Sequence, residues 1–93
     1  MIVHFSCKET EKIWNGETST KFPPEIQVRA RLKLRMLHAA AAVMDLRMPP
    51  GNNLEALKGD RDGWYSIRIN NLWRICFEWR DGNAHRVELT DYH

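Results

Sequence analysis

Hydrophobic positions repeat with a helical period in the first half of the chain and with a strand period in the second half. Apolar residues that step by three or four positions predict one long amphipathic helix with a buried seam: Ile26, Ala30, Leu34, Leu37, Ala41 and Met44. The helix is expected to begin at Pro24, because proline favours the first helical position. It is expected to end before residues 48–51, where two prolines and a glycine prevent continuation.

Two shorter elements are predicted before this helix. Residues 2–5 are apolar enough for a short strand. Residues 8–14 contain good helix formers with one apolar edge, and Asn15–Gly16 is a signal for a helix C-terminus. A polar loop that contains Pro23 then leads into the long helix.

The second half of the chain predicts an antiparallel meander. Strands are expected within residues 54–57, 64–69, 73–79 and 84–90, with hairpin turns at Asn70–Asn71 and Asp81–Gly82. Alternation places one apolar set on the helix-facing side: Tyr65, Ile67, Ile69, Trp73, Ile75, Phe77 and Trp79. In the last strand His85, Val87 and Leu89 are expected to share a face. Helices followed by antiparallel strands define an α+β layer architecture.

Length and composition fit a single domain over residues 1–93. The chain is 43% hydrophobic and 28% charged, as in ordinary globular proteins, and its nine aromatic residues suit a thin core. We therefore expect an open groove and no cofactor. The sequence predicts no signal peptide and no membrane-spanning segment, so we expect a cytoplasmic protein without disulfides.

Positive charge is concentrated in the long helix and its flanks. The net charge is only +2, but residues 21–47 contain six Lys or Arg and two Asp or Glu, and such a local surplus attracts phosphate. One stripe steps along the helix away from the apolar seam: Gln27, Arg31, Arg35 and His38. The stripe is predicted to be either a solvated face or a binding surface for RNA or an acidic partner.

Several kinds of site have no support in the sequence. The four histidines and two cysteines lack zinc-type spacing, so no metal site is expected. The chain has no glycine-rich phosphate loop and no nucleophile elbow. Isolated cations remain at strand ends. Lys58 precedes a turn, and Arg74 alternates away from the apolar face, where we expect it to point into the open.

Three segments taken together resemble a known family. The run LKGDRDGWYSI (residues 57–67), the strand WRICF (73–77) and the closing DYH (91–93) are similar in order and spacing to the HigB toxins of the RelE/ParE superfamily. The stretch KIWNGE (12–17) fits the same pattern, so the resemblance spans essentially the whole chain. It implies a RelE-like fold, with two N-terminal helices packed on a mainly antiparallel sheet of about four to five strands.

The resemblance also implies a function and partners. Members of this kind are ribosome-dependent mRNA endoribonucleases that are neutralised by a HigA-type antitoxin. The expected partners are therefore that antitoxin and mRNA in the A site of the small ribosomal subunit. Operator DNA is expected only as a partner of the toxin–antitoxin complex. No membrane partner is implied.

The resemblance assigns site residues position by position. It places catalytic roles on Lys58, Arg74, Tyr92 and His93. One relative has a histidine three positions before the lysine, where this chain has Glu55, so the general base is left open between Glu55 and Lys58. The residues expected to contact RNA are Arg31, Arg35, Arg61 and Asp91.

Each of these side chains suits one step of RNA strand scission. Attack of the ribose 2′-OH on the adjacent phosphate builds negative charge, which the Arg74 guanidinium can meet bidentately. Histidine side chains ordinarily titrate near neutral pH, so His93 suits proton donation to the leaving 5′ oxygen. The Tyr92 ring is expected to stack on an unstacked base. Glu55 is expected to be either the base or only a counter-charge to nearby cations.

Two other functions fit the same pattern. A ParE-like toxin would inhibit DNA gyrase through this fold without nuclease activity, and it would have no use for a terminal Tyr-His pair. A small nucleic-acid-binding adaptor would use the basic helix but not Arg74. Deleting residues 92–93 and replacing Arg74 therefore separate the three interpretations.

Overall fold

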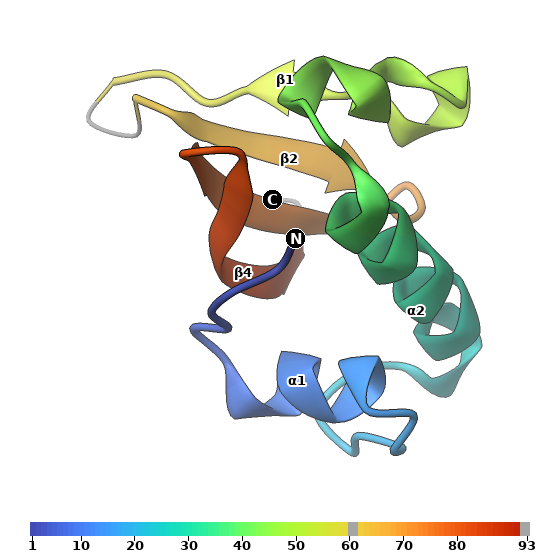
Figure 1. The fold of residues 1–93 in the computed structure, drawn as a ribbon. Helices are drawn as coiled ribbons and strands as arrows, with labels where there is room; N and C mark the ends of the chain where they lie inside the picture. The colour runs from blue at the N-terminus through green and yellow to red at the C-terminus, as the bar shows by residue number, and fades with distance from the viewer. Residues whose placement is uncertain (60–61, 92–93) are drawn as a thin grey trace.

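The computed structural model describes residues 1–59 and 62–91, and over these residues it has an α+β fold (Figure 1). The helices are α1 (Lys8–Trp14) and α2 (Pro24–Ala39), followed by the short 3-10 helices η1 (Val43–Arg47) and η2 (Pro50–Asn52). The strands are β1 (Glu55–Ala56), β2 (Trp64–Arg68), β3 (Trp73–Arg80) and β4 (Asn83–Asp91). They pair in chain order, each antiparallel to the next. The predicted fold class is confirmed.

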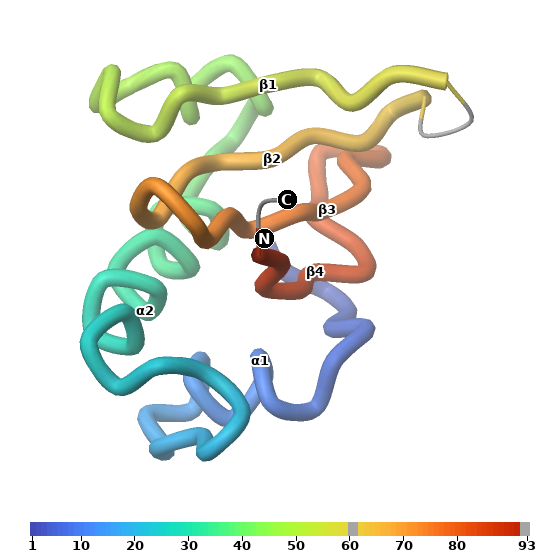
Figure 2. The backbone as a smooth tube through the Cα atoms, turned by 180° about the vertical axis from the view of Figure 1, so that it is seen from behind, coloured from blue at the N-terminus to red at the C-terminus, as the bar shows by residue number. Residues whose placement is uncertain are grey.

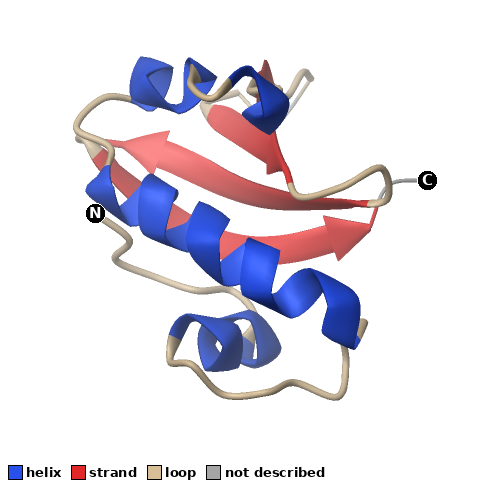
Figure 3. Ribbon diagram, turned by 90° about the vertical axis from the view of Figure 1, so that its right-hand side faces the viewer, coloured by secondary structure: helices blue, strands red, loops and turns tan. Residues whose placement is uncertain are grey.

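The helices cover one face of the sheet, and the core lies between the two layers (Figure 3). The first four positions of the predicted seam in α2, from Ile26 to Leu37, are buried. They meet Ile67 of β2 and both Ile75 and Phe77 of β3, as the strand alternation predicted. Burying each such side chain contributes about 1.5–3 kcal/mol. The sheet is therefore a fixed platform whose other face is left for polar residues.

Helix α2 ends at Ala39, well before the predicted limit at Met48. The prediction that Ala41 and Met44 extend the buried seam is therefore wrong, because both residues are exposed. No helix in the described ranges is long and apolar enough to cross a bilayer.

A local acceptor explains the early end of α2. The Asp45 carboxylate accepts hydrogen bonds from the backbone N–H groups of Ala41 and Ala42, each at 3.0 Å. An acceptor of this kind competes with helical hydrogen bonding. The chain then turns into η1, which buries Leu46 against the core instead.

Both hairpin turns lie where they were predicted. Asp81 and Gly82 have positive φ angles of 54° and 77°, which match the right-handed twist of the flanking strands. Neither asparagine of the β2–β3 turn has a positive φ, so this turn does not use the tolerance of asparagine for that conformation. Instead, Oδ1 of Asn70 accepts hydrogen bonds from the backbone N–H groups of Leu72 and Trp73, both at 2.8 Å.

The N-terminal segment runs beside β4 (Figure 2), but it does not form the regular strand predicted for residues 2–5. The pairs Ile2–Ala84 and Phe5–Val87 form isolated parallel bridges. The ladder is interrupted at a bulge in β4, where Arg86 has a φ of 53°. A bulge bends its strand and disrupts the hydrogen-bond ladder locally.

The same bulge changes which residues of β4 face the core. On β3, Cys76 and Glu78 are two positions apart, but their partners on β4, Glu88 and His85, are three apart. The extra residue breaks the alternation, so Ala84 is buried together with Val87 and Leu89, whereas His85 is not. The prediction that His85 shares their face is wrong.

Candidate active site

The face of the sheet turned away from the helices carries a row of polar side chains. Residues directly opposite each other in antiparallel strands point to the same face. The register brings the following residues to this face: Glu55, Ser66, Arg68, Arg74, Cys76 and Thr90. Arg74 alternates with the buried Ile75, so it lies on the side that the sequence predicted.

Arg74 is nevertheless buried, with 4% of its surface exposed, and the expectation that it points into the open is wrong. Its Nε donates a hydrogen bond to Ser66 Oγ at 2.8 Å, and its Nη2 donates to the Asn53 carbonyl oxygen at 2.7 Å. Nη1 lies 3.8 Å from Glu55 Oε1. The Asn53 carbonyl, just before β1, is a partner that strand alternation alone does not reveal, and it joins Ser66 and Glu55 around the guanidinium. They hold the guanidinium in one orientation, as bidentate phosphate binding requires.

Asn53 hydrogen-bonds both Arg74 and Glu55, and the sequence analysis did not identify it. Its backbone is left-handed (φ 45°, ψ 57°) at the end of η2. The carbonyl oxygen accepts from Arg74, while Nδ2 donates to Glu55 Oε1 at 3.3 Å. Asparagine adopts this conformation more readily than most residues. The signal that could have found it is the run PGNN (residues 50–53), a composition typical of tight turns.

A groove of about 330 Å³ lies against Arg74, and we call it the Arg74 groove. Four residues predicted from the sequence line it: Glu55, Lys58, Arg74 and Asp91. The rest of the lining is Leu57, Ser66, Cys76 and Thr90. Segments far apart in the sequence therefore place a guanidinium, an ammonium and two carboxylates around one hollow.

Three further predicted residues, Arg61, Tyr92 and His93, lie outside the described residues. Tyr92 and His93 follow directly after Asp91, which pairs with Trp73 at the end of β4 and lines the groove. The roles assigned to these three side chains stay predictions.

The charged residues of the Arg74 groove contribute little to the stability of the fold and are suited to a role in catalysis. The Glu55 side chain is 42% exposed, so its ion pair with Arg74 is screened and contributes about 0–1 kcal/mol. A carboxylate beside a fixed guanidinium can accept a proton next to the place where a phosphate would bind. In the part of the chain that the structure describes, no group of three His, Cys, Asp or Glu could hold a metal ion.

The polar stripe predicted along α2 is not one solvent-exposed surface. Gln27 is buried and hydrogen-bonds the loop between the helices. Nε of Arg31 donates to the Ile13 carbonyl oxygen at 2.9 Å, which ties α2 to α1. Nδ1 of His38 accepts from a backbone N–H of the N-terminal segment. Arg35 is exposed, and RNA contacts by Arg31 and Arg35 stay a prediction.

Solved structures of other proteins share this architecture. The chain is similar to one in the heterotetrameric YoeB–YefM toxin–antitoxin complex from Staphylococcus aureus, with a TM-score of 0.62, 18% identity and coverage of 100% of this chain and 98% of that chain. It is also similar to a YafQ mutant from E. coli, with a TM-score of 0.57, 11% identity and coverage of 94% and 91%. These similarities define the class by fold, an α+β architecture that also occurs in a toxin–antitoxin complex.

Sequence comparison identifies the family. Toxin HigB-1 of Vibrio cholerae serotype O1 is 40% identical over 93 residues, which cover 99% of this chain and 98% of the relative. Endoribonuclease HigB of Proteus vulgaris is 29% identical over 93 residues, and both chains are fully covered. A family model described as the RelE-like toxin of the type II toxin–antitoxin system HigB matches residues 3–93. The chain therefore belongs to the HigB family of RelE-like toxins.

Proposed function

We propose that this protein is a ribosome-dependent mRNA endoribonuclease that acts in the cytoplasm and inhibits translation. The observation that carries the proposal is the fixed guanidinium of Arg74 beside Glu55 and Lys58 in one groove. Family membership supports it, as does the name of the Proteus vulgaris relative, Endoribonuclease HigB.

The proposed reaction is transesterification within the RNA strand. Glu55 or Lys58 accepts the proton of the ribose 2′-OH, and the oxygen attacks the adjacent phosphorus. The bond from phosphorus to the 5′ oxygen then breaks, leaving a 2′,3′-cyclic phosphate on one product and a 5′-OH on the other. Arg74, held in one orientation at the wall of the groove, offsets the negative charge that develops on the phosphate oxygens.

The end of the chain completes this mechanism. His93 donates the proton that the leaving 5′ oxygen needs. Tyr92 stacks on a base next to the scissile linkage. Both follow Asp91, which lines the Arg74 groove.

Dependence on the ribosome fits a site in which Tyr92 is the one ring proposed to stack on a base. Among the described residues that line the Arg74 groove, none is aromatic, whereas proteins that bind single strands unaided gain about 1–3 kcal/mol for each base stacked on an aromatic ring. An RNA strand that is already held in place loses less entropy when it binds, so it needs fewer such contacts with the protein. The A site of the small ribosomal subunit would present mRNA in this way.

A second partner in the proposal is a HigA-type antitoxin. The chain belongs to a family of toxins from two-component systems, and the similar YoeB–YefM structure is a toxin–antitoxin complex. We expect the antitoxin to bind this protein and prevent cleavage, and operator DNA to be bound only by the resulting complex. Co-purification with the co-expressed antitoxin tests this partner.

Mapping mRNA 5′ ends in bacteria tests the proposed function. Wild type, Arg74→Ala and a variant lacking residues 92–93 would be expressed without antitoxin, with Arg80→Ala as a control at the exposed far end of β3. New ends within translated codons are expected for wild type and Arg80→Ala and not for the other two. Growth arrest without new ends, retained by the truncated protein, would contradict the proposal and favour gyrase inhibition.

A further inference from the structure

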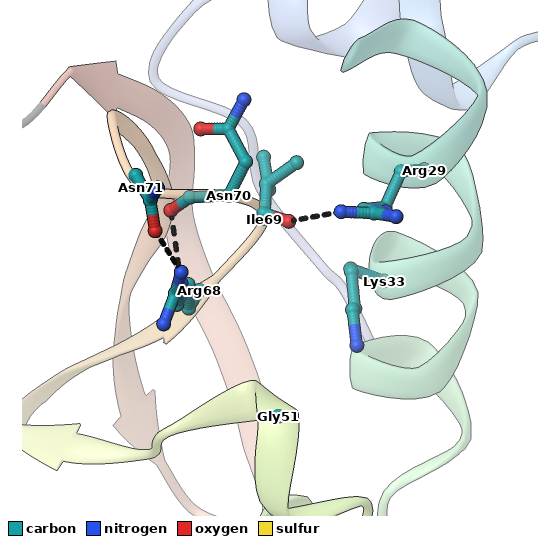
Figure 4. Close-up of a pocket in the computed structure, with 7 residues that line it drawn as sticks. All are labelled: Arg29, Lys33, Gly51, Arg68, Ile69, Asn70 and Asn71. Atoms are coloured by element: carbon teal, nitrogen blue, oxygen red, sulfur yellow. Dashed lines mark hydrogen bonds between the residues drawn. The ribbon is translucent and has the colours of Figure 1, made fainter.

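A second groove, of about 560 Å³, lies between α2 and the β2–β3 turn (Figure 4), and we call it the α2 groove. Two cations reach it from α2 and one from the end of β2: Arg29, Lys33 and Arg68. Its other lining residues are Gly51, Ile69, Asn70 and Asn71. The cationic side chains come from segments far apart in the chain, so their convergence is a property of the fold.

The three cations of the α2 groove are held by neutral acceptors. Arg29 donates to the Ile69 carbonyl oxygen at 3.3 Å, and Lys33 donates to Oδ1 of Asn52 at 2.5 Å. Arg68 donates to the Asn70 carbonyl oxygen and to the side-chain oxygen of the next residue. Within the described residues, the ion pairs within 4.0 Å lie elsewhere in the molecule. The groove therefore keeps an excess of positive charge in a fixed arrangement.

Holding these cations close together has a cost. Partial burial, and then the neighbouring charge of Arg29, lower the pKa of Lys33 below its usual range. Arg68 also stands directly opposite Arg74 in the β2–β3 ladder, and like charges in such a pair destabilise a sheet. The fold tolerates these costs, and an anion bound among the cations would relieve them.

A third hollow adjoins both the α2 groove and the Arg74 groove. It is small, about 130 Å³, and is lined by Arg68, Asn70 and Asn71, which it shares with the α2 groove, and by Arg74, which it shares with the Arg74 groove. Asn53 completes its lining. Positive side chains therefore line a series of neighbouring hollows from the proposed scissile position to α2.

We infer that the α2 groove binds a backbone phosphate of the same RNA strand that is cut beside Arg74, a few nucleotides from the scissile linkage. The inference rests on the proposed function, and it names a second contact for the substrate. A single strand carries a phosphate at every nucleotide, so it can meet cations spaced along a path. A protein segment would instead need apolar anchors, and Ile69 is the one large apolar residue among those that line the groove.

Gly51 provides a test that leaves the groove's hydrogen bonds in place. A Cβ atom added to Gly51 meets nothing within 4 Å, so a side chain fits there. Gly51→Glu puts a carboxylate at the edge of the groove and repels phosphate, whereas Gly51→Gln adds nearly the same shape without charge. Arg29→Gln and Lys33→Gln remove groove cations, and Arg80→Gln removes an exposed charge at the other end of β3.

The experiment measures direct RNA binding by fluorescence anisotropy. The probes are fully 2′-O-methylated strands, which cannot be cut, of about 3 and about 12 nucleotides. Gly51→Glu is expected to bind the longer strand about 10-fold more weakly than Gly51→Gln does, with equal affinity for the shorter strand. Arg29→Gln and Lys33→Gln should each reduce the salt slope for the longer strand by about 0.7, the value for one phosphate contact. Arg80→Gln should match wild type.

Four results would overturn the inference. Gly51→Glu and Gly51→Gln could bind the longer strand equally well, or wild type could gain no affinity from the added length. The groove variants could instead lose affinity only for ribosomes without mRNA, which would assign the groove to ribosomal RNA, or only for the antitoxin. Cleavage of mRNA by wild type on ribosomes is measured in parallel. Its absence would refute the proposed function, whereas cleavage with unaltered strand binding by the groove variants would refute this inference alone.

Discussion

The Arg74 groove and the α2 groove each share lining residues with one small hollow, yet their charges differ in kind. The Arg74 groove mixes two carboxylates with two cations, whereas the larger α2 groove is lined by three cations and no carboxylate among the described residues. Strand scission needs proton acceptors and donors as well as positive charge, while strand binding needs positive charge alone. The comparison therefore supports the proposal that the smaller groove carries out the chemistry and the larger one holds the substrate.

The largest expected effect is that of replacing the guanidinium of Arg74 with another cation. Arg74→Lys keeps the charge but loses the planar fork, so we expect cleavage of mRNA on ribosomes to slow by about 10²- to 10³-fold. The single-turnover rate constant is the measurement, with Arg80→Lys as the control. A decrease below about 10-fold would mean that charge alone suffices at this position, and the contrast between the two grooves would lose its basis.

The next effect tests the carboxylate that distinguishes the Arg74 groove. Glu55→Gln keeps the shape of the side chain but removes its capacity to accept a proton, so we expect about a 10²-fold loss in the rate of cleavage if it is the base. Ribosome binding should stay unchanged, as measured by co-sedimentation. Full activity in this variant would leave Glu55 as a counter-charge to Arg74, and Lys58 would then be the base.

A smaller effect is expected from the α2 groove, and it should appear in a different kinetic constant. On ribosomes carrying mRNA, Gly51→Glu should raise KM by about 10-fold relative to Gly51→Gln while kcat stays the same, because uniform binding affects KM alone. Steady-state cleavage at several ribosome concentrations gives both constants. A fall in kcat with unchanged KM would show that the α2 groove takes part in the cleavage step, and the proposed difference between the two grooves would be wrong.

The smallest effect concerns Asn53, whose carbonyl fixes Arg74. An alanine in the left-handed conformation costs about 1 kcal/mol more than glycine. We therefore expect Asn53→Ala to melt about 4–8 °C below Asn53→Gly in a domain of this size. Both variants lose the side-chain hydrogen bond to Glu55, so the pair isolates the backbone. Equal melting temperatures would show that the turn relaxes, and Arg74 would be less rigidly held than we conclude.

Local patterns predicted much of the fold because the features that specify it are local. Alternation along β2 and β3 gave the buried face that includes Ile67 and Phe77, and Asp81–Gly82 gave its hairpin turn. The prediction failed where one residue changes the local pattern. Asp45 draws the chain out of the helix, and the left-handed Arg86 shifts the face of β4.

The site was harder to predict than the fold, because its contacts join distant parts of the chain. Family resemblance named Lys58 and Arg74, but nothing near Arg74 in the sequence shows that the Asn53 carbonyl accepts a hydrogen bond from it. The α2 groove was missed for the same reason. Arg29 and Arg68 are 39 positions apart, and only the packing of α2 beside the β2–β3 turn brings them together. Counting charges along the sequence detected the surplus of positive charge on α2, but it could not show which of these side chains line a groove.

The most direct test of the central claim is the chemistry of the RNA ends produced by the purified protein on purified ribosomes carrying a defined mRNA. Wild type is expected to cut within the A-site codon and to leave a 2′,3′-cyclic phosphate and a 5′-OH, with no cutting by Arg74→Ala and none without ribosomes. Equal cleavage by Arg74→Ala, or intact mRNA with wild type, would contradict the assignment of the Arg74 groove as the active site.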